Sequence, residues 1–306
     1  MTSNRITQLS AAALLFFSAG SAGAQRINAV ATTPDLAALV KAIGGDAVDV
    51  KALAKPTEDP HFVDAKPSHI VTLNRADLLI QGGAELEMGW LPPLLESSRN
   101  SKIGVGAAGR ILASEGITML EVPAALDRSA GDVHALGNPH FMLDPLNVKI
   151  IVAHIARTLG QIAPASAAQF QSNLRTFNST LDSKLGEWQR QLAPFRGAKI
   201  VTYHNDFVYL AQSFGLEVVE KLEPKPGIAP SPAHVARVIA RMKETGANVI
   251  MVQPFQNRRT AETVARQTQA IVLDLPQQPG AIKGTDSYFE LMDHVVRTLA
   301  AGLQGR

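Results

Sequence analysis

The sequence predicts an α/β protein of two lobes, each with a mostly parallel sheet flanked by helices, joined by one long backbone helix. Short apolar runs alternate with helical patterns in both halves of the 306-residue chain, which is typical of βαβ units with right-handed crossovers. Between the halves, residues 165–192 carry apolar side chains at helical spacing, with no glycine or proline before Gly186. At about 1.5 Å per residue, such a helix would be roughly 40 Å long, the width of a domain.

These features divide the chain into a signal peptide at 1–24, an N-terminal lobe at 25–164, the linking helix at 165–195 and a C-terminal lobe at 196–306. The first segment has a basic start at Arg5, a short apolar core at 11–17 and small residues before a cleavage site after Ala24. This pattern is typical of a secretory signal and is too short for a membrane span. We therefore expect the mature protein in the periplasm.

Composition narrows the class of protein further. The chain contains no cysteine, so we expect neither a disulfide nor the acylated cysteine of a lipoprotein. The net charge of +2 is small and the basic residues are scattered, which excludes a nucleic-acid footprint. No later stretch reaches about 18 uninterrupted apolar residues, so no membrane span is expected. We expect a monomer.

In the N-terminal lobe, capping and breaking residues delimit the elements. Thr33 is a plausible cap for a helix that begins with Pro34, and Gly44-Gly45 ends this helix. Further helices are expected at Lys66–Asn74 and Trp90–Leu95. The expected strands are Ile27–Thr32, Val48–Leu53, Asp77–Gln81 and Lys102–Gly106.

The C-terminal lobe repeats this alternation. A helix should end at Phe214, Ser231 should cap a helix that reaches Thr245, and a closing helix is expected at Tyr288–Leu303. The proline-rich segment 223–230 is predicted to be a loop. The expected strands are Lys199–Tyr203, Leu216–Val219, Val249–Val252 and Ile271–Leu273.

Four candidate metal ligands lie on loops that follow or adjoin these strands, where open α/β sheets bind ligands: His61, His140, His204 and Asp274. His140 lies in a turn that Pro139 and Pro145 stiffen. Three neutral imidazoles and one carboxylate make a set that zinc accepts readily, whereas manganese prefers more oxygen ligands. Because these residues are far apart in the sequence, their spacing alone is a weak signal.

The residues around these positions resemble a known family. Asp59-Pro60-His61, the stretch Asn138–Pro145, Tyr203-His204, and Asp274 with Ser287-Tyr288 are similar, in this order, to four regions of the zinc- and manganese-type solute-binding proteins of ABC importers. The resemblance covers almost the whole mature chain. Each piece alone is unspecific, but the combination is specific.

The resemblance implies two α/β lobes, a metal between them, and delivery to a membrane permease that an ATPase powers. The third ligand is a histidine in zinc-type members and commonly a glutamate in manganese-type ones, so His204 favours Zn²⁺ as the transported ligand. Zinc-type members often carry a long loop rich in His and Asp before the second ligand, but here 123–137 holds a single histidine, His134. A periplasmic metallochaperone is a further possible partner.

Alternatives stay open at this point. Asp274 is the least secure ligand, and water, Glu58 or Asp206 could replace it. His134 could hand metal to His140, while the helical histidines and the helix cap Asp144 have structural interpretations. A manganese or iron receptor of the same fold would use the same site. A secreted zinc hydrolase would need three histidines and an open position, but the chain has no His-Glu-x-x-His run and no separate general base.

Overall fold

The computed structural model describes residues 26–124, 134–225 and 227–305, so the predicted signal peptide lies outside the described residues. Two four-stranded sheets form the lobes, and every strand pairing in them is parallel. The first sheet has the order β2-β1-β3-β4, from β1 (Ile27–Ala31), β2 (Val48–Ala52), β3 (Leu78–Gln81) and β4 (Arg110–Leu112). The second has the order β6-β5-β7-β8, from β5 (Lys199–Thr202), β6 (Glu217–Lys221), β7 (Val249–Val252) and β8 (Ile271–Asp274).

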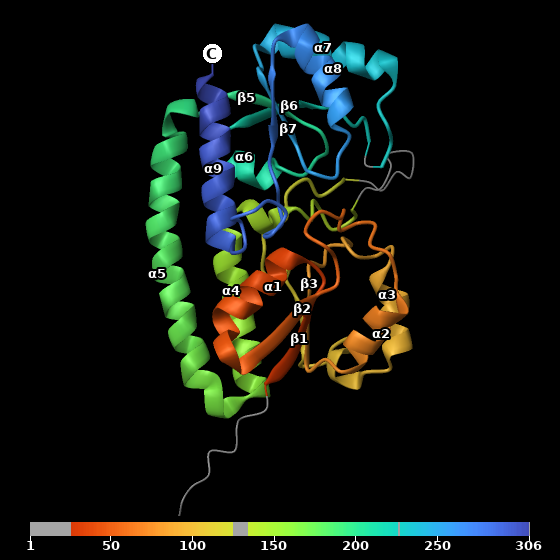
Figure 1. Cartoon of the computed structure of the whole chain (residues 1–306), viewed down its shortest axis with the longest axis vertical. Helices are drawn as coiled ribbons and strands as arrows, with labels where there is room; N and C mark the ends of the chain where they lie inside the picture. The colour runs from red at the N-terminus through yellow and green to blue at the C-terminus, as the bar shows by residue number, and fades with distance from the viewer. Residues whose placement is uncertain (1–25, 125–133, 226, 306) are drawn as a thin grey trace, which may run out of the picture.

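Helices flank both sheets, as predicted for a parallel arrangement (Figure 1). The first lobe contains α1 (Pro34–Gly44), α2 (Pro67–Asn74), α3 (Leu91–Ser98) and α4 (Pro145–Ile162). The second contains α6 (Val208–Phe214), α7 (Pro232–Thr245), α8 (Arg258–Thr268) and α9 (Tyr288–Gln304). The predicted fold class is therefore confirmed. Among the described residues, no helix combines the length and apolar character needed to cross a bilayer.

The predicted long helix is α5 (Ala167–Leu192), which runs along both lobes beside α4 and α9 (Figure 1). Its buried side chains recur at helical spacing: Phe170, Phe177, Leu181, Trp188 and Leu192. Near its C-terminal end, the Trp188 Nε1–H donates to Asp293 Oδ1 of α9 at 2.7 Å. The helix is therefore packed against both lobes along its length.

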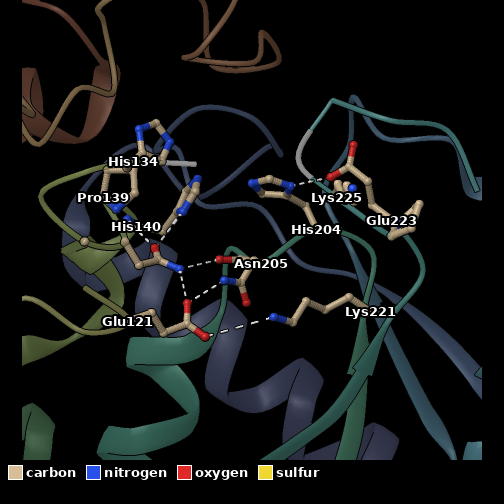
Figure 2. Close-up of a pocket in the computed structure, with 12 residues that line it drawn as sticks. Glu121, His134, Pro139, His140, His204, Asn205, Lys221, Glu223 and Lys225 are labelled. Carbon is tan, nitrogen blue, oxygen red and sulfur yellow. Dashed lines mark hydrogen bonds and ion pairs between the residues drawn. The ribbon is translucent and has the colours of Figure 1, made fainter. Parts of the chain in front are cut away.

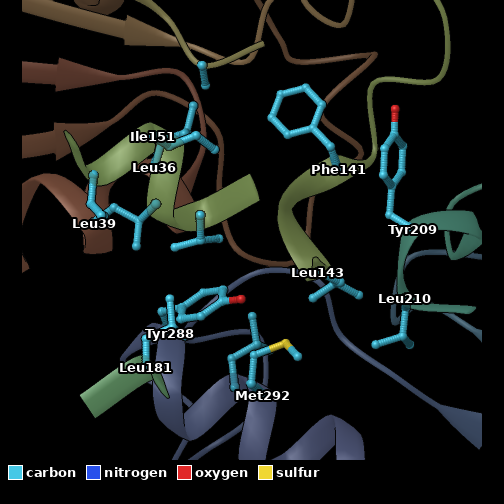
Figure 3. Close-up of a cluster of buried hydrophobic side chains, with 14 of the residues drawn as sticks. Leu36, Leu39, Phe141, Leu143, Ile151, Leu181, Tyr209, Leu210, Tyr288 and Met292 are labelled. Atoms are coloured by element: carbon cyan, nitrogen blue, oxygen red, sulfur yellow. The ribbon is translucent and has the colours of Figure 1, made fainter. Parts of the chain in front are cut away.

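A single apolar cluster extends through both lobes. Figure 3 shows Leu36 of α1 and Phe141 of the 139–144 segment in the same region as Tyr209, Tyr288 and Met292 of the C-terminal lobe. Phe141 and Tyr209 meet edge to face, with ring centroids 6.3 Å apart. The loops between the lobes therefore pack on an apolar core that both lobes share.

One predicted strand is wrong. Residues 102–106 form part of a 3₁₀ turn and a loop, in which Val105 is 94% exposed, and the edge strand is Arg110–Leu112 instead. The side chain of Asn100 accepts a hydrogen bond from Lys102 N at 3.0 Å and so caps this turn. A short run in which glycines alternate with apolar residues gave no means of distinguishing the two cases.

Candidate metal centre

The structure brings three of the four predicted ligands together. One ring nitrogen from each of His61, His140 and His204 lies within 4.8 Å of the others. The ring centroids are 5.1 Å apart for His61 and His140, 5.2 Å for His140 and His204, and 5.6 Å for His61 and His204. Two of these residues come from the N-terminal lobe and one from the C-terminal lobe, so the group lies at the interface between the lobes.

The same local hydrogen-bonding pattern orients His61 and His140. Asp59 Oδ1 accepts from both the backbone N–H and Nδ1 of His61, at 2.9 and 2.8 Å. Asn138 Oδ1 accepts from the same two atoms of His140, at 3.0 and 2.9 Å. In each case a proline separates the two residues and restricts the turn. With Nδ1 engaged, Nε2 is the nitrogen left for a metal.

His204 is held by a residue distant in sequence. It follows the central strand β5, and its Nδ1 is hydrogen-bonded to Glu223 Oε2. The other carboxylate oxygen of Glu223 accepts from Gly227 N at 2.9 Å, so the proline-rich loop positions this carboxylate. All three histidines therefore have a partner at Nδ1, which is how proteins orient imidazoles toward a metal.

The surroundings keep His140 neutral and favour charge at its neighbours. Burial lowers the pKa of His140 well below the ordinary 6.5, and the nearby imidazoles of His61 and His204 lower it further. Burial opposes ionisation of Asp59 too, but the hydrogen bonds from His61 outweigh it, so the pKa of Asp59 is lowered. For His204, burial lowers the pKa, but the hydrogen bond to Glu223 and the charges of nearby carboxylates together outweigh burial, so the pKa is raised. The site thus combines a neutral imidazole with carboxylates that can offset the charge of a cation.

A fourth imidazole, that of His134, lies beside His61. His134 Nε2 lies 3.2 Å from His61 Nε2, and the two rings stack with centroids 5.3 Å apart. Burial and the charges of His61 and His204 lower the pKa of His134 to about 4, so this ring is neutral at ordinary pH. Glu85 Oε2 accepts from the backbone N–H of Ala135 at 2.5 Å, which holds the backbone next to His134 in place.

Asp274 is the predicted ligand that the structure does not bring to the histidines. Its side chain is 50% exposed and is ion-paired with Arg258. Asp274 is the last residue of β8, which is the edge strand of its sheet, and Arg258 begins the neighbouring α8. At this edge of the sheet the carboxylate of Asp274 therefore pairs with the guanidinium group of Arg258.

The two substitutes considered for Asp274 each have one carboxylate oxygen bound to other groups of the protein. Glu58 Oε2 accepts from Lys55 N at 3.0 Å within its own loop. Asp206 is buried, its Oδ2 accepts from Gln253 and Gln256, and burial raises its pKa to about 6. Asp206 therefore influences the site through its charge near His204.

Histidines in the helices lie outside this group, as expected, at positions 69, 154, 234 and 294. His234, for example, lies in α7, and its Nε2 is 2.9 Å from the carbonyl oxygen of Lys221 in β6. Asp144 caps α4, because its Oδ1 accepts from Leu146 N at 2.9 Å. This confirms the structural interpretation of Asp144.

Two hollows open onto the histidines, with cavity volumes of about 210 and 220 Å³. Both are lined by His140, His204 and Glu223. Sites for drug-sized organic ligands usually occupy about 300–1,000 Å³, so these volumes suit an ion with a few waters better. Figure 2 shows the first hollow, with His134, His140 and His204 around it.

The chain matches, over residues 29–302, the family described as ZnuA, zinc-uptake complex component A, periplasmic. The chain belongs to this family. The predicted resemblance to this group of proteins is therefore confirmed.

Curated relatives differ in the metal that their names state. The high-affinity zinc uptake system protein ZnuA of Brucella abortus (strain 2308) is 29% identical over 161 residues, which cover 52% of this chain and 48% of that protein. The chain thus spans about half the length of the Brucella relatives it matches. The manganese ABC transporter substrate-binding lipoprotein PsaA of Streptococcus mitis is 24% identical over 293 residues, which cover 92% of this chain and 91% of that protein.

Solved structures agree on the fold. A crystal structure of ZnuA has a TM-score of 0.78 at 23% identity and covers 92% of this chain and 100% of that one. A Mn-bound periplasmic metal-binding protein from Candidatus Liberibacter asiaticus has a TM-score of 0.74 at 20% identity and covers 91% and 100%. At these identities the likeness establishes the architecture of the two lobes.

Sequence reasoning missed the partners at Nδ1. Asp59 and Asn138 were detectable, because the pattern Asx-Pro-His occurs twice and places an acceptor two residues before each histidine. Glu223 carried no such signal, since it lies 19 residues after His204 in a loop defined by its prolines. Only the pairing of β5 with β6 brings that loop alongside His204.

Proposed function

We propose that this protein binds Zn²⁺ between its lobes through His61, His140 and His204 and delivers it to an ABC importer. The observation that supports this most directly is the convergence of the three imidazoles, each with its Nδ1 occupied. This leaves three Nε2 atoms as donors, and neutral imidazole nitrogen is a preferred zinc ligand.

For the fourth position we propose His134 rather than Asp274. Its Nε2 is already 3.2 Å from that of His61, whereas Asp274 is paired with Arg258. Four nitrogen donors would favour zinc, because manganese is better served by carboxylate and water oxygen. A manganese or iron receptor remains the second candidate, since relatives named for manganese share the fold.

The proposed partners are the permease and ATPase of an importer, with a periplasmic metallochaperone as a possible donor of metal. We propose a periplasmic, monomeric protein that is not a lipoprotein. The chain has no cysteine to acylate, and the family is described as periplasmic.

The test is a calorimetric titration of the metal-free protein with zinc, followed by competition with manganese. His140→Ala and His204→Ala should each weaken zinc binding by more than the roughly 10- to 100-fold typical of outer-shell changes. His154→Ala, in α4 and outside the cluster, is the matched control. Wild-type affinity in both site variants would overturn the proposal. If manganese binds more tightly than zinc, manganese would be the transported metal instead.

A further inference from the structure

The side-chain amide of Asn138 has all of its hydrogen-bonding capacity in use. Its Oδ1 accepts from the backbone N–H and Nδ1 of His140, at 3.0 and 2.9 Å. Its Nδ2 donates to the carbonyl oxygen of Asn205 at 2.8 Å and to Glu121 Oε2 at 2.9 Å. An amide has two donors and two acceptor sites, so none is left over.

Glu121 links this amide to the opposite lobe. It lies in the segment between β4 and α4, yet its Oε2 also accepts from Asn205 Nδ2 at 2.5 Å. Its Oε1 is 4.0 Å from the Nζ of Lys221 at the end of β6. Figure 2 shows these contacts between Glu121, Asn205 and Lys221 below the histidines.

The backbone around Glu121 is held in an unusual conformation. Glu121 has φ of +53°, in the left-handed region that residues with a side chain adopt rarely. The preceding residue, Leu120, accepts from Asn138 N at 2.8 Å and donates its own N–H to Tyr209 Oη at 2.9 Å. Such strain persists where surrounding contacts determine the conformation, and it is concentrated at functional sites.

We propose that Glu121 is a positioning residue for the metal centre, acting on His140 through Asn138 and joining the two lobes as it does so. This inference rests on the proposed function. A carboxylate can only accept, so it turns the amide N–H group of Asn138 toward itself and leaves Oδ1 for His140. Oδ1 then requires a proton on His140 Nδ1, and the lone pair of Nε2 faces the metal.

The charge of Glu121 also sets which residue can occupy position 138. An aspartate there would place a second carboxylate next to Oε2 of Glu121, where like charges repel. Glutamine at position 121 would remove this repulsion and could donate to the new carboxylate. Positions 121 and 138 should therefore be coupled.

The first test compares zinc dissociation from wild type, Glu121→Ala and Glu121→Gln by stopped flow with a chromophoric chelator. Glu121→Ala should release zinc faster by on the order of 10-fold, because two hydrogen bonds to a charged acceptor are lost. Glu121→Gln keeps an oxygen that can accept and should recover most of the difference. Glu115→Ala removes an exposed carboxylate from the same segment and is the matched control.

The second test reads the tautomer of His140 directly in the metal-free protein, by long-range ¹⁵N–¹H NMR on histidine-labelled samples. Wild type should show His140 protonated at Nδ1, whereas Glu121→Ala should show a mixture of tautomers. In the third test, Asn138→Asp should weaken zinc binding in the wild-type background and less so with Glu121→Gln. A purely structural role would change neither the tautomer nor this coupling.

The outcomes separate the two proposals. Equal dissociation rates and equal tautomer populations in wild type and Glu121→Ala would overturn the role of Glu121 while leaving zinc binding intact. Failure of the wild type to bind zinc would overturn the proposed function, yet the metal-free tautomer measurement would still test the link from Glu121 to His140. Urea unfolding of each variant verifies that the protein is folded under the conditions of the zinc and tautomer measurements.

Discussion

Each of the three central histidines has a different acceptor at Nδ1: aspartate, asparagine or glutamate. Two of these acceptors are anionic, and a carboxylate bonded to a ligating imidazole raises its basicity. Together Asp59 and Glu223 supply two negative charges against the two positive charges of a zinc ion. The third acceptor, Asn138, is neutral, so it orients His140 without adding charge to the site.

Glu223→Ala tests this arrangement at the scale of a residue. Without the carboxylate, His204 loses its orientation and its preferred tautomer, so zinc affinity should fall roughly 10- to 100-fold. Glu217→Ala removes an exposed glutamate of β6, the strand that precedes the loop of Glu223, and is the matched control. Competition with a zinc chelator measures the affinities, and equal values for the two variants would contradict the assigned role.

Asp35 provides a test of stability against pH. Burial raises its pKa from 3.8 to about 6, although hydrogen bonds from Thr33 and Leu36 oppose this. The folded protein therefore holds this proton more tightly than the unfolded chain does. Its contribution to the free energy of unfolding is full below about pH 3.8 and is lost as the pH rises through about 6.

Asp35→Asn keeps an oxygen for the N–H of Leu36 but cannot ionise. Relative to wild type, the variant should gain at most about 3 kcal/mol of stability as the pH rises through this window. Urea unfolding on either side of the window measures the gain. A difference between the two proteins that stays constant with pH would contradict the buried, ionisable state of Asp35.

At the scale of the element, the first turns of two helices show that a serine before a helix does not always form a capping hydrogen bond. Ser287 caps α9, where its Oγ accepts from Glu290 N at 3.3 Å and Glu290 Oε2 accepts in return from Ser287 N at 2.9 Å. This capping box satisfies donors that the first turn leaves free. Ser166 precedes α5 in the same way, but its side chain makes no capping hydrogen bond.

The two serines therefore form a matched pair. Ser287→Ala should lower the free energy of unfolding by about 1 kcal/mol, because a made cap is lost. Ser166→Ala should change it by less than about 0.5 kcal/mol, as surface substitutions usually do. Chemical denaturation of both variants measures the difference, and equal losses would show that the Ser287 cap contributes nothing.

At the scale of the whole molecule, two buried tyrosines connect the lobes to different degrees. Tyr209 Oη accepts from Leu120 N at 2.9 Å and donates to the carbonyl oxygen of Asn138 at 2.8 Å, so α6 holds the loop that carries His140. Tyr288 is equally buried, but its hydroxyl has no hydrogen-bond partner among the described residues.

Removing each hydroxyl should therefore have different effects. Tyr209→Phe should cost about 1–3 kcal/mol, because it leaves the half-buried N–H of Leu120 and the carbonyl oxygen of Asn138 without this partner. Tyr288→Phe should cost less than this or stabilise the protein, since no bond is lost. Thermal and urea unfolding distinguish the two, and a larger loss for Tyr288→Phe would contradict the bonding assigned here.

The sequence by itself determined most of the secondary-structure elements and the local geometry of two of the three central histidines. Periodicity and capping residues predicted seven of the eight strands and the long α5, because these signals lie within a few neighbouring residues. The repeated Asx-Pro-His turn likewise orients His61 and His140 from two positions away. The strand expected at 102–106 failed because a short apolar run has no period to measure.

Only the tertiary structure decided which distant groups meet. Glu223 reaches His204 through strand pairing, Glu121 reaches Asn205 across the lobes, and Asp274 turns to Arg258 at a sheet edge. None of these contacts leaves a pattern in the sequence, because each depends on how loops from separate strands converge. Packing of the shared core sets that convergence, and with it the surroundings of the metal.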